Sequence, residues 1–161
     1  MDNYKCERIY PMQITPTKIP TEKHWQLYLR ADPSKRLIQK YLQNGFAFEI
    51  DDNREPIGVI ILTPQSENEL EIKNIAVAEG HENQGIATQL LKYARHFAKF
   101  HGYETLTIGT GSTSFKQLYL YQKLGFRITE VKKDFFVKNY SEPIYESGLH
   151  LQDMILLRQK I

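Results

Sequence analysis

Residues 74–87 read NIAVAEGHENQGIA, and this stretch decides how the chain folds. An apolar segment leads through a short loop to Gly85, after which apolar residues recur at helical spacing. The start of a helix attracts anions through its unpaired N–H groups and its dipole, and a glycine lets the backbone approach one closely. The stretch therefore predicts an anion-binding turn between a strand and a helix. An ordinary turn that Gly85 merely tightens is the alternative interpretation.

A helix is predicted after this turn, because the apolar residues of segment 86–98 fall on one face. Residues 105–108 then predict a short strand, so that strand, helix and strand form a parallel crossover unit. A second helix is predicted to end at Leu124, before Gly125. The candidates for its N-cap are Ser112, Thr113 and Ser114.

Before the turn, the pattern predicts a meander of three strands over residues 46–50, 57–62 and 69–77. The continuous apolar run 57–62 indicates a strand that is buried on both faces. Two short helices are predicted ahead of this meander, over residues 21–32 and 33–45, because their apolar residues are spaced by three to four.

The two ends of the chain are predicted to add strands, over residues 5–15 at the start and over 126–137 and 149–157 at the end. The polar loop 138–148 joins the last two. The whole order predicts an α/β (α+β) domain with a mixed sheet flanked by helices.

Composition excludes several classes of protein. The chain has 161 residues, 41% hydrophobic and 25% charged, which is typical of one globular domain spanning residues 1–161. The net charge of +2 argues against a nucleic-acid partner. One cysteine permits no intrachain disulfide, and the histidines lack metal-ligand spacing, so we expect no metal. No apolar run approaches the ~20 residues of a membrane helix and no signal peptide is evident, so we expect no membrane partner and a cytoplasmic location.

Two common phosphate-binding loops are absent from the sequence. The Walker pattern G-x-x-x-x-G-K-[ST] does not occur, and Gly109-Thr110-Gly111 supplies only the first half of the dinucleotide fingerprint G-x-G-x-x-G. These absences disfavour nucleotide hydrolysis and hydride transfer.

The loop at residues 82–87 instead resembles motif A of the GNAT N-acetyltransferases, Q/R-x-x-G-x-G/A. Residues 75–77 are similar to the family's central strand, and residues 120–126 resemble its segment L/F-Y-x-K-x-G-F. Two motifs in the right order and at the right separation are more specific than either alone. The resemblance implies a mostly antiparallel sheet with a strand–helix–strand cofactor unit, and it implies an enzyme that uses acetyl-CoA.

The resemblance also implies which residues hold the cofactor. The pyrophosphate is expected on the backbone of Asn83–Thr88, and the pantetheine arm beside Ile75–Val77. Glu82 stands where the family prefers Gln or Arg, so backbone N–H groups are expected to do most of the binding. The expected cofactor-binding residues are Ile75, Ala76, Val77, Glu82, Asn83, Gln84, Gly85, Ile86, Ala87, Thr88 and Ser114.

For such an enzyme the acceptor is expected to be a primary amine. An alkyl ammonium has a pKa near ~10.4, so only about one molecule in 2,500 is nucleophilic at pH 7, and a base is needed. Glu71 is the candidate base, and Glu69 shares its face of the strand. Tyr121, in the position of the family's general acid, is expected to protonate the departing thiolate, and Tyr119 is the reserve candidate.

The acceptor site is predicted in the long loop 138–148, where Glu142, Tyr145 and Glu146 suit an ammonium group through charge and cation–π contact. Cys6 lies far from both motifs in the sequence, which disfavours it as a covalent nucleophile. We expect a small polyamine-like or amino-bearing metabolite to be acetylated by direct attack in a ternary complex. A protein or antibiotic acetyltransferase and a non-catalytic CoA-binding module are the alternatives, and a homodimer through the final strands is compatible with each.

Overall fold

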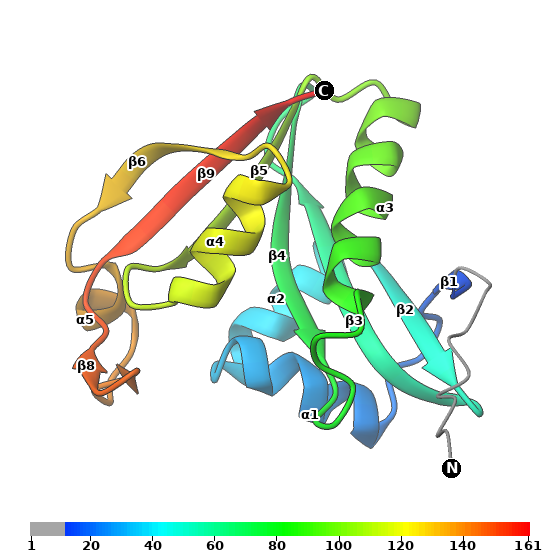
Figure 1. The fold of residues 1–161 in the computed structure, drawn as a ribbon, viewed down its shortest axis with the longest axis horizontal. Coiled ribbons are helices and arrows are strands. Elements are labelled where there is room, and N and C mark those ends of the chain that lie inside the picture. The colour runs from blue at the N-terminus through cyan, green and yellow to red at the C-terminus, as the bar shows by residue number, and fades with distance from the viewer. Residues whose placement is uncertain (1–11) are drawn as a thin grey trace, which may run out of the picture.

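A seven-stranded sheet organises the chain in the computed structural model, which describes residues 12–161 (Figure 1). Its strands are β1 Ile14–Pro16, β2 Phe46–Asp52, β3 Glu55–Pro64, β4 Glu69–Val77, β5 Thr105–Gly111, β6 Arg127–Lys132 and β9 Met154–Lys160. They lie in the order β1-β2-β3-β4-β5-β9-β6. The pair β4–β5 is parallel, and the other neighbouring pairs of this sheet are antiparallel. The predicted fold class, a mixed and mostly antiparallel sheet, is confirmed.

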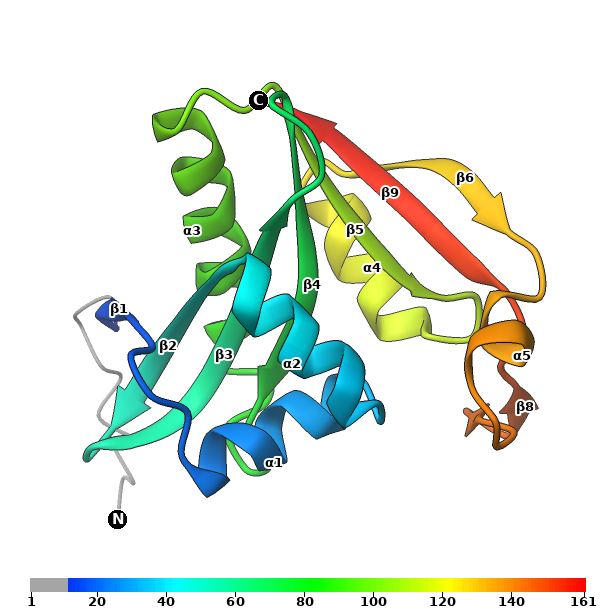
Figure 2. The ribbon, with the colours of Figure 1, turned by 180° about the vertical axis from the view of Figure 1, so that it is seen from behind.

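Helices cover both faces of the sheet (Figures 1 and 2). Helices α1 Glu22–Ala31 and α2 Lys35–Asn44 lie on one face, and α3 Ile86–Phe100 and α4 Phe115–Lys123 lie on the other. A short helix, α5 Phe135–Asn139, and a two-stranded sheet of β7 Tyr145–Glu146 and β8 Leu149–His150 lie next to the end where β6 finishes and β9 begins.

Strand β3 lies between two apolar cores. Its Ile60 belongs to the cluster that includes Leu90 of α3, whereas Val59 packs with Tyr28 of α1 and Ile38 of α2. All five side chains are fully buried. Burial of an aliphatic side chain of this size stabilises the fold by about 1.5–3 kcal/mol. The predicted strand with two buried faces is therefore confirmed.

Helix α2 begins and ends at residues suited to those positions, Ser34 before its first turn and Gly45 after its last. The Ser34 hydroxyl accepts a hydrogen bond from the Leu37 N–H at 3.3 Å, which caps the first turn. After the helix, a Cβ atom at Gly45 would lie only 2.3 Å from the Leu62 carbonyl oxygen of β3. A glycine is required there because the chain passes so close to the sheet.

The predicted strand over residues 126–137 is wrong beyond Lys132. Asp134 adopts a φ of 58° and its N–H donates to the Asp153 carboxylate at 2.7 Å, so the chain turns and β6 ends. The apolar residues that follow form α5, in which the ring of Phe136 stacks on Tyr140 one turn later, with centroids 5.7 Å apart. A short run of neighbouring apolar residues is compatible with both the spacing of a strand and that of a helix, and here it forms a helix.

The predicted loop 138–148 and strand 149–157 are also corrected. Their middle forms the β7–β8 hairpin, whose turn residues Ser147 and Gly148 both have positive φ, as a two-residue hairpin turn requires. Strand β9 begins only at Met154, and it pairs with a β5 that extends beyond the predicted residues 105–108 to Gly111. At the other end of the chain, β1 begins at Ile14, and most of the strand predicted over residues 5–15 lies outside the described residues.

Candidate active site

The parallel pair β4–β5 separates partway along its length. The ladder joins residues 69–72 to residues 105–108 and ends there, although both strands continue. On its other side, β4 remains paired with β3 as far as Val77. The β5-facing backbone of residues 73–77 therefore lies outside the sheet ladder, and part of this segment lines a cavity.

A β-bulge at Lys73 redirects the side chains of β4 at this point. Ile61 of β3 pairs with Asn74 and the next residue pairs with Ile72, so Lys73 is the extra residue. The buried Asn74 amide then donates to the Tyr28 carbonyl of α1 at 2.9 Å. Bulges often re-aim side chains beside active sites, and this one fixes the strand against α1 where it borders the cavity.

The loop between β4 and α3 is shaped by residues with positive φ. Gly80, Asn83 and Gly85 have φ values of 82°, 60° and 80°. A Cβ atom built on Gly85 would have no atom within 4 Å, so the space in front of this residue is open. Gly85 has no side chain that could cap α3, so the N–H groups of the first turn remain available to an anion.

Glu82 is held within this loop by two partners. Its carboxylate accepts a hydrogen bond from the Gly80 N–H at 2.8 Å and from the Arg30 guanidinium at 3.0 Å. Its own backbone N–H, that of Gly80 and the charge of Arg30 together hold the pKa of the Glu82 carboxyl below its ordinary value. The glutamate is therefore ionised, and a cation from α1 accompanies it.

A cavity of about 500 Å³ opens where β4 and β5 separate. Its walls come from the α1–α2 corner, β4, β5, α4, α5 and β7, which are far apart in the sequence. The side chains with chemical functions that line it include Asp32, Tyr41, Glu71, Tyr121, Tyr140 and Glu146. Both predicted catalytic residues, Glu71 and Tyr121, are thus brought to one cavity.

Tyr121 of α4 is 4% exposed and lines the cavity. Burial raises the pKa of its phenol well above the ordinary value of 10.0, so the hydroxyl carries its proton at neutral pH. Tyr119, the reserve candidate, is 67% exposed and is absent from the cavity lining. Of the two tyrosines that the sequence offered as general acid, only Tyr121 therefore borders the cavity.

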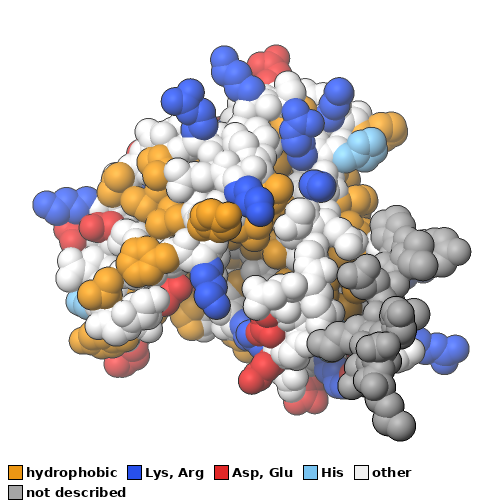
Figure 3. All heavy atoms as spheres, in the orientation of Figure 1, with side chains coloured by type: hydrophobic (Ala, Val, Ile, Leu, Met, Phe, Trp, Pro, Cys, Tyr) orange, Lys and Arg blue, Asp and Glu red, His pale blue; other side chains and the backbone are white. Residues whose placement is uncertain are grey.

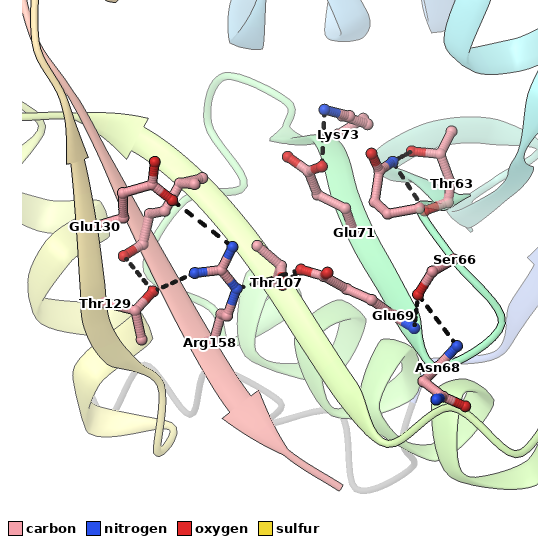
Figure 4. A network of polar contacts seen from close by, with 12 residues as sticks. Thr63, Ser66, Asn68, Glu69, Glu71, Lys73, Thr107, Thr129, Glu130 and Arg158 are labelled. Atoms are coloured by element: carbon pink, nitrogen blue, oxygen red, sulfur yellow. Dashed lines mark hydrogen bonds and ion pairs between the residues drawn. The ribbon is translucent and has the colours of Figure 1, made fainter.

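Glu69 and Glu71 are distinguished in the same way (Figure 4). Glu69 accepts hydrogen bonds from Thr107 and from Arg158. These contacts hold the pKa of its carboxyl below the ordinary value, and the hydrogen bond from Thr107 has the largest effect. Glu71 lies against Lys73, with 2.8 Å between Oε2 and Nζ, and lines the cavity. Only Glu71 of this pair borders the cavity.

The structure adds three cavity residues that the sequence did not single out. Asp32 follows α1 and is 8% exposed, and its Oδ1 accepts from the Ser34 N–H at 2.9 Å and from the Tyr140 hydroxyl at 3.0 Å. Burial, and then the charges of Asp32 and Glu71, raise the pKa of Tyr41 to about 12. Asp32 and Tyr140 are 108 residues apart, and no local pattern could have joined them.

Two of the three predicted acceptor residues line the cavity and the third does not. Tyr145 and Glu146 of β7 line the cavity, and the Glu146 carboxylate accepts a hydrogen bond from the Ser114 hydroxyl at 2.8 Å. Ser114 is the N-cap residue of α4 by position, but its side chain makes no capping hydrogen bond. Glu142 is exposed and is not part of the cavity lining.

Apart from Ser114 at the start of α4, the predicted cofactor residues lie along one continuous path from β4 through the loop into α3. Ile75 and Ser114 also line the cavity. Ile86 is 1% exposed in the core, so it can offer a ligand only its backbone.

Other sequence expectations concern the surface. On the face in Figure 3, apolar side chains gather over α4 and β6, and the exposed ones include Phe115, Tyr119, Ile128 and Val131. The predicted homodimer stays a prediction.

Among residues 12–161, no three His, Cys, Asp or Glu side chains are grouped as a metal site, and no helix there is long and apolar enough to cross a membrane. Cys6 lies outside the described part of the chain.

Comparisons with known proteins agree with this geometry. The model of the acetyltransferase (GNAT) family matches residues 8–126. An uncharacterized N-acetyltransferase of Bacillus subtilis, YvbK, is 41% identical over 133 residues, which cover 83% of this chain and 86% of that protein. A GNAT family acetyltransferase of Elizabethkingia anophelis, crystallised with acetyl-CoA bound, superposes with a TM-score of 0.89 at 49% identity, covering 93% of this chain and 98% of that one. A Bacillus subtilis acetyltransferase in complex with CoA superposes with a TM-score of 0.89 at 37% identity, covering 94% of this chain and 99% of that one.

Proposed function

Since the chain belongs to the acetyltransferase (GNAT) family, we propose that it transfers the acetyl group of acetyl-CoA directly to a primary amine of a small molecule. The observation that carries the proposal is the cavity beside the β4–β5 split, which Glu71 and Tyr121 both line. It lies next to a strand–glycine–helix turn suited to an anion. We treat residues 1–161 as one acetyltransferase domain, because the matched residues 8–126 share a sheet with β6 and β9.

The loop and β4 fit the cofactor of the family. The open space in front of Gly85 and its positive φ leave a cradle that a Cβ atom would fill, and the backbone N–H groups of the first turn of α3 follow it directly in the chain. We assign the pyrophosphate to these N–H groups and the pantetheine arm to the β5-facing backbone of Ile75–Val77, with Ser114 nearby. Acetyl-CoA supplies an activated acetyl group as a thioester, and a main-chain N–H of this β4 segment would polarise its carbonyl.

Glu82 does not oppose a bound phosphate in this arrangement. Its carboxylate is already engaged by Gly80 and by Arg30, so the pair brings a guanidinium from α1 to the edge of the loop. The positive charge that the family's first motif residue often supplies is here contributed by a residue 52 positions earlier in the chain.

Glu71 and Tyr121 divide the proton transfers. The carboxylate of Glu71 takes the proton of the acceptor ammonium, directly or through water, and the freed nitrogen attacks the acetyl carbon. The N–C bond forms while the C–S bond breaks, and Tyr121 gives its phenolic proton to the departing sulfur. The second proton of the attacking nitrogen then passes through water to the phenolate, which leaves a neutral amide and a neutral Tyr121. A phenol with the ordinary pKa of 10.0 is already protonated at neutral pH, and burial raises the pKa of Tyr121 further, so the proton that this role requires is present.

The cavity supports a small amine as the acceptor. Its lining includes Asp32, Glu146 and the rings of Tyr41, Tyr140 and Tyr145, and such surroundings favour an ammonium group. A volume of about 500 Å³ suits a metabolite.

A panel of acceptors tests the proposal. Wild-type protein is incubated with acetyl-CoA and with small amines, aminoglycosides, peptides with free N-termini, or no acceptor, and free thiol is measured while mass spectrometry identifies the product. Thiol release that depends on a small amine, with an N-acetyl product, is expected. Turnover on peptides alone would contradict the small-molecule acceptor, and acetyl-CoA binding with no turnover on any acceptor would contradict the enzyme.

A further inference from the structure

The Asp32 carboxylate lies at the corner between α1 and α2 and borders the cavity. It is 8% exposed, so more than nine tenths of the residue is buried. Its two hydrogen-bond donors, the Ser34 N–H and the Tyr140 hydroxyl, are both neutral. Among residues 12–161 no ion pair involves Asp32. A buried carboxylate without a cation is costly, and a cationic ligand would relieve that cost.

Of the other acids in the cavity lining, Glu71 has a cationic partner, whereas the less buried Glu146 accepts only from the neutral Ser114 hydroxyl. The Glu71 carboxylate lies 2.8 Å from the Lys73 ammonium. The guanidinium of Arg30, which also lines the cavity, lies 3.0 Å from the carboxylate of Glu82, which does not. The remaining lining cation, Lys132, is on β6 and exposed. Asp32 is therefore the most buried acid of the cavity, and it has no cation of its own.

Tyr41 lines the cavity together with both carboxylates. The charges of both Asp32 and Glu71 raise the pKa of the Tyr41 phenol, so both carboxylates are close enough to act on this ring. The Lys73 ammonium already lies 5.7 Å from the centroid of the ring, which shows that a cation fits against it. An acceptor that extends from Glu71 toward Asp32 would pass along Tyr41.

We infer that Asp32 holds a second ammonium group of the acceptor, one that does not react, so that the substrate is a diamine or polyamine rather than a monoamine. The inference rests on the proposed function, which places the reacting nitrogen at Glu71. One nitrogen loses its proton and is acetylated, while the other remains charged beside Asp32 and Tyr140. Asp32 is then the residue that sets the acceptor's chemical class and the spacing of its two nitrogens.

A substrate series on the wild-type protein tests the inference. Diamines from ethylenediamine to hexamethylenediamine are compared with monoamines, amino alcohols and ω-amino acids of the same length, by thiol release at fixed acetyl-CoA. We expect kcat/KM to favour the best diamine over its amino alcohol by about tenfold or more, as for a hydrogen bond between charged groups, and the ω-amino acid to be poorest. Equal rates for diamine, amino alcohol and monoamine would overturn the inference and leave the proposed function intact, whereas no turnover of any amine would overturn both.

Variants assign the preference to Asp32. Asp32→Asn is expected to abolish the preference through KM while monoamine turnover changes little. Glu142→Gln makes the same change of charge on an exposed residue outside the cavity lining and is expected to keep the preference; its loss there as well as in D32N would contradict the assignment. Asp32→Glu keeps the charge on a longer side chain and is expected to move the optimum to a shorter diamine. An unchanged optimum in a folded D32E protein, checked by thermal melting, would also contradict the role of Asp32.

Discussion

The proposed cofactor side of the site and its proposed acceptor side differ in how their parts are arranged along the chain. The cofactor side is one continuous segment, residues 69–88, which runs through β4, the loop and the start of α3. The acceptor side is assembled from Asp32 and Tyr41 near the start and Tyr140 and Glu146 near the end. The first offers mainly backbone groups to its ligand, and the second offers side chains.

This difference separates what a family shares from what an individual member selects. Backbone N–H groups at a helix start can bind a phosphate without a side-chain charge, so we expect the segment to tolerate a Glu82 that is paired with Arg30. The acceptor side depends on the identity of single side chains, so one substitution changes which amine is favoured. Tyr121 lies where the two sides meet, and its loss should have the largest effect.

Tyr121→Phe is expected to lower kcat by about 10²–10⁴-fold, the usual contribution of a general acid, while acetyl-CoA affinity stays within about twofold. Thiol-release kinetics and calorimetric titration with acetyl-CoA measure the two. Tyr119→Phe, on the exposed side of the same helix, is the matched control and should leave kcat unchanged. Equal losses in both variants would argue against Tyr121 as the acid.

Gly85→Ala tests the cofactor side alone. A non-glycine residue at this positive φ costs about 1–3 kcal/mol of stability, and the new methyl group would also stand in the ligand's space. We expect the Kd for CoA to rise about tenfold or more. Gly102→Ala is the matched control, since Gly102 follows the other end of α3 with a φ of 81° and has equally open surroundings. It should lose similar stability and bind CoA normally, and weaker CoA binding there too would show a general effect of destabilisation.

Arg30→Ala should weaken acetyl-CoA binding less, by about two- to fivefold, because the Arg30–Glu82 pair is more than two fifths exposed and screened by solvent. Glu82→Gln is expected to be nearly neutral, and adding it to Arg30→Ala should restore part of the lost affinity. Calorimetric titrations of the four proteins form a double-mutant cycle. Arg30→Ala with unchanged affinity at low salt would show that the guanidinium does not assist the loop.

The smallest effect concerns alkaline pH. The pKa of Tyr41 is raised to about 12 from the ordinary 10.0, so the folded protein keeps a proton that the unfolded chain releases. Its contribution to stability is complete below pH 10 and is lost as pH rises toward 12. Urea denaturation over this range should show the free energy of unfolding falling with pH, less steeply in Tyr41→Phe. An identical slope in the variant would mean that Tyr41 titrates normally.

Sequence reasoning succeeded where a site is local. The three central strands, the helix that begins at Gly85 and the motif ending at Phe126 depend on spacing within short windows, which the chain itself displays. It failed after Lys132, because Phe135 and Phe136 fit either a strand or a helix and only the turn at Asp134 decides between them.

The acceptor side could not be derived in the same way. Asp32 precedes a proline and looks like an ordinary helix end, and its partner Tyr140 comes 108 residues later. Glu146 could be proposed because acids and tyrosines cluster in one loop, but only the fold shows that it borders the cavity and that Glu142 does not. Side chains that meet only through tertiary structure leave no periodic signal.

The central claim is that the two sides meet so that the amine attacks acetyl-CoA directly. Initial rates measured while acetyl-CoA and the best amine are both varied test it most directly. Intersecting lines in double-reciprocal plots, with no acetylated protein detectable by mass spectrometry when acetyl-CoA is added alone, are the expected result. Parallel lines together with a stable acetyl group on the protein would contradict the account.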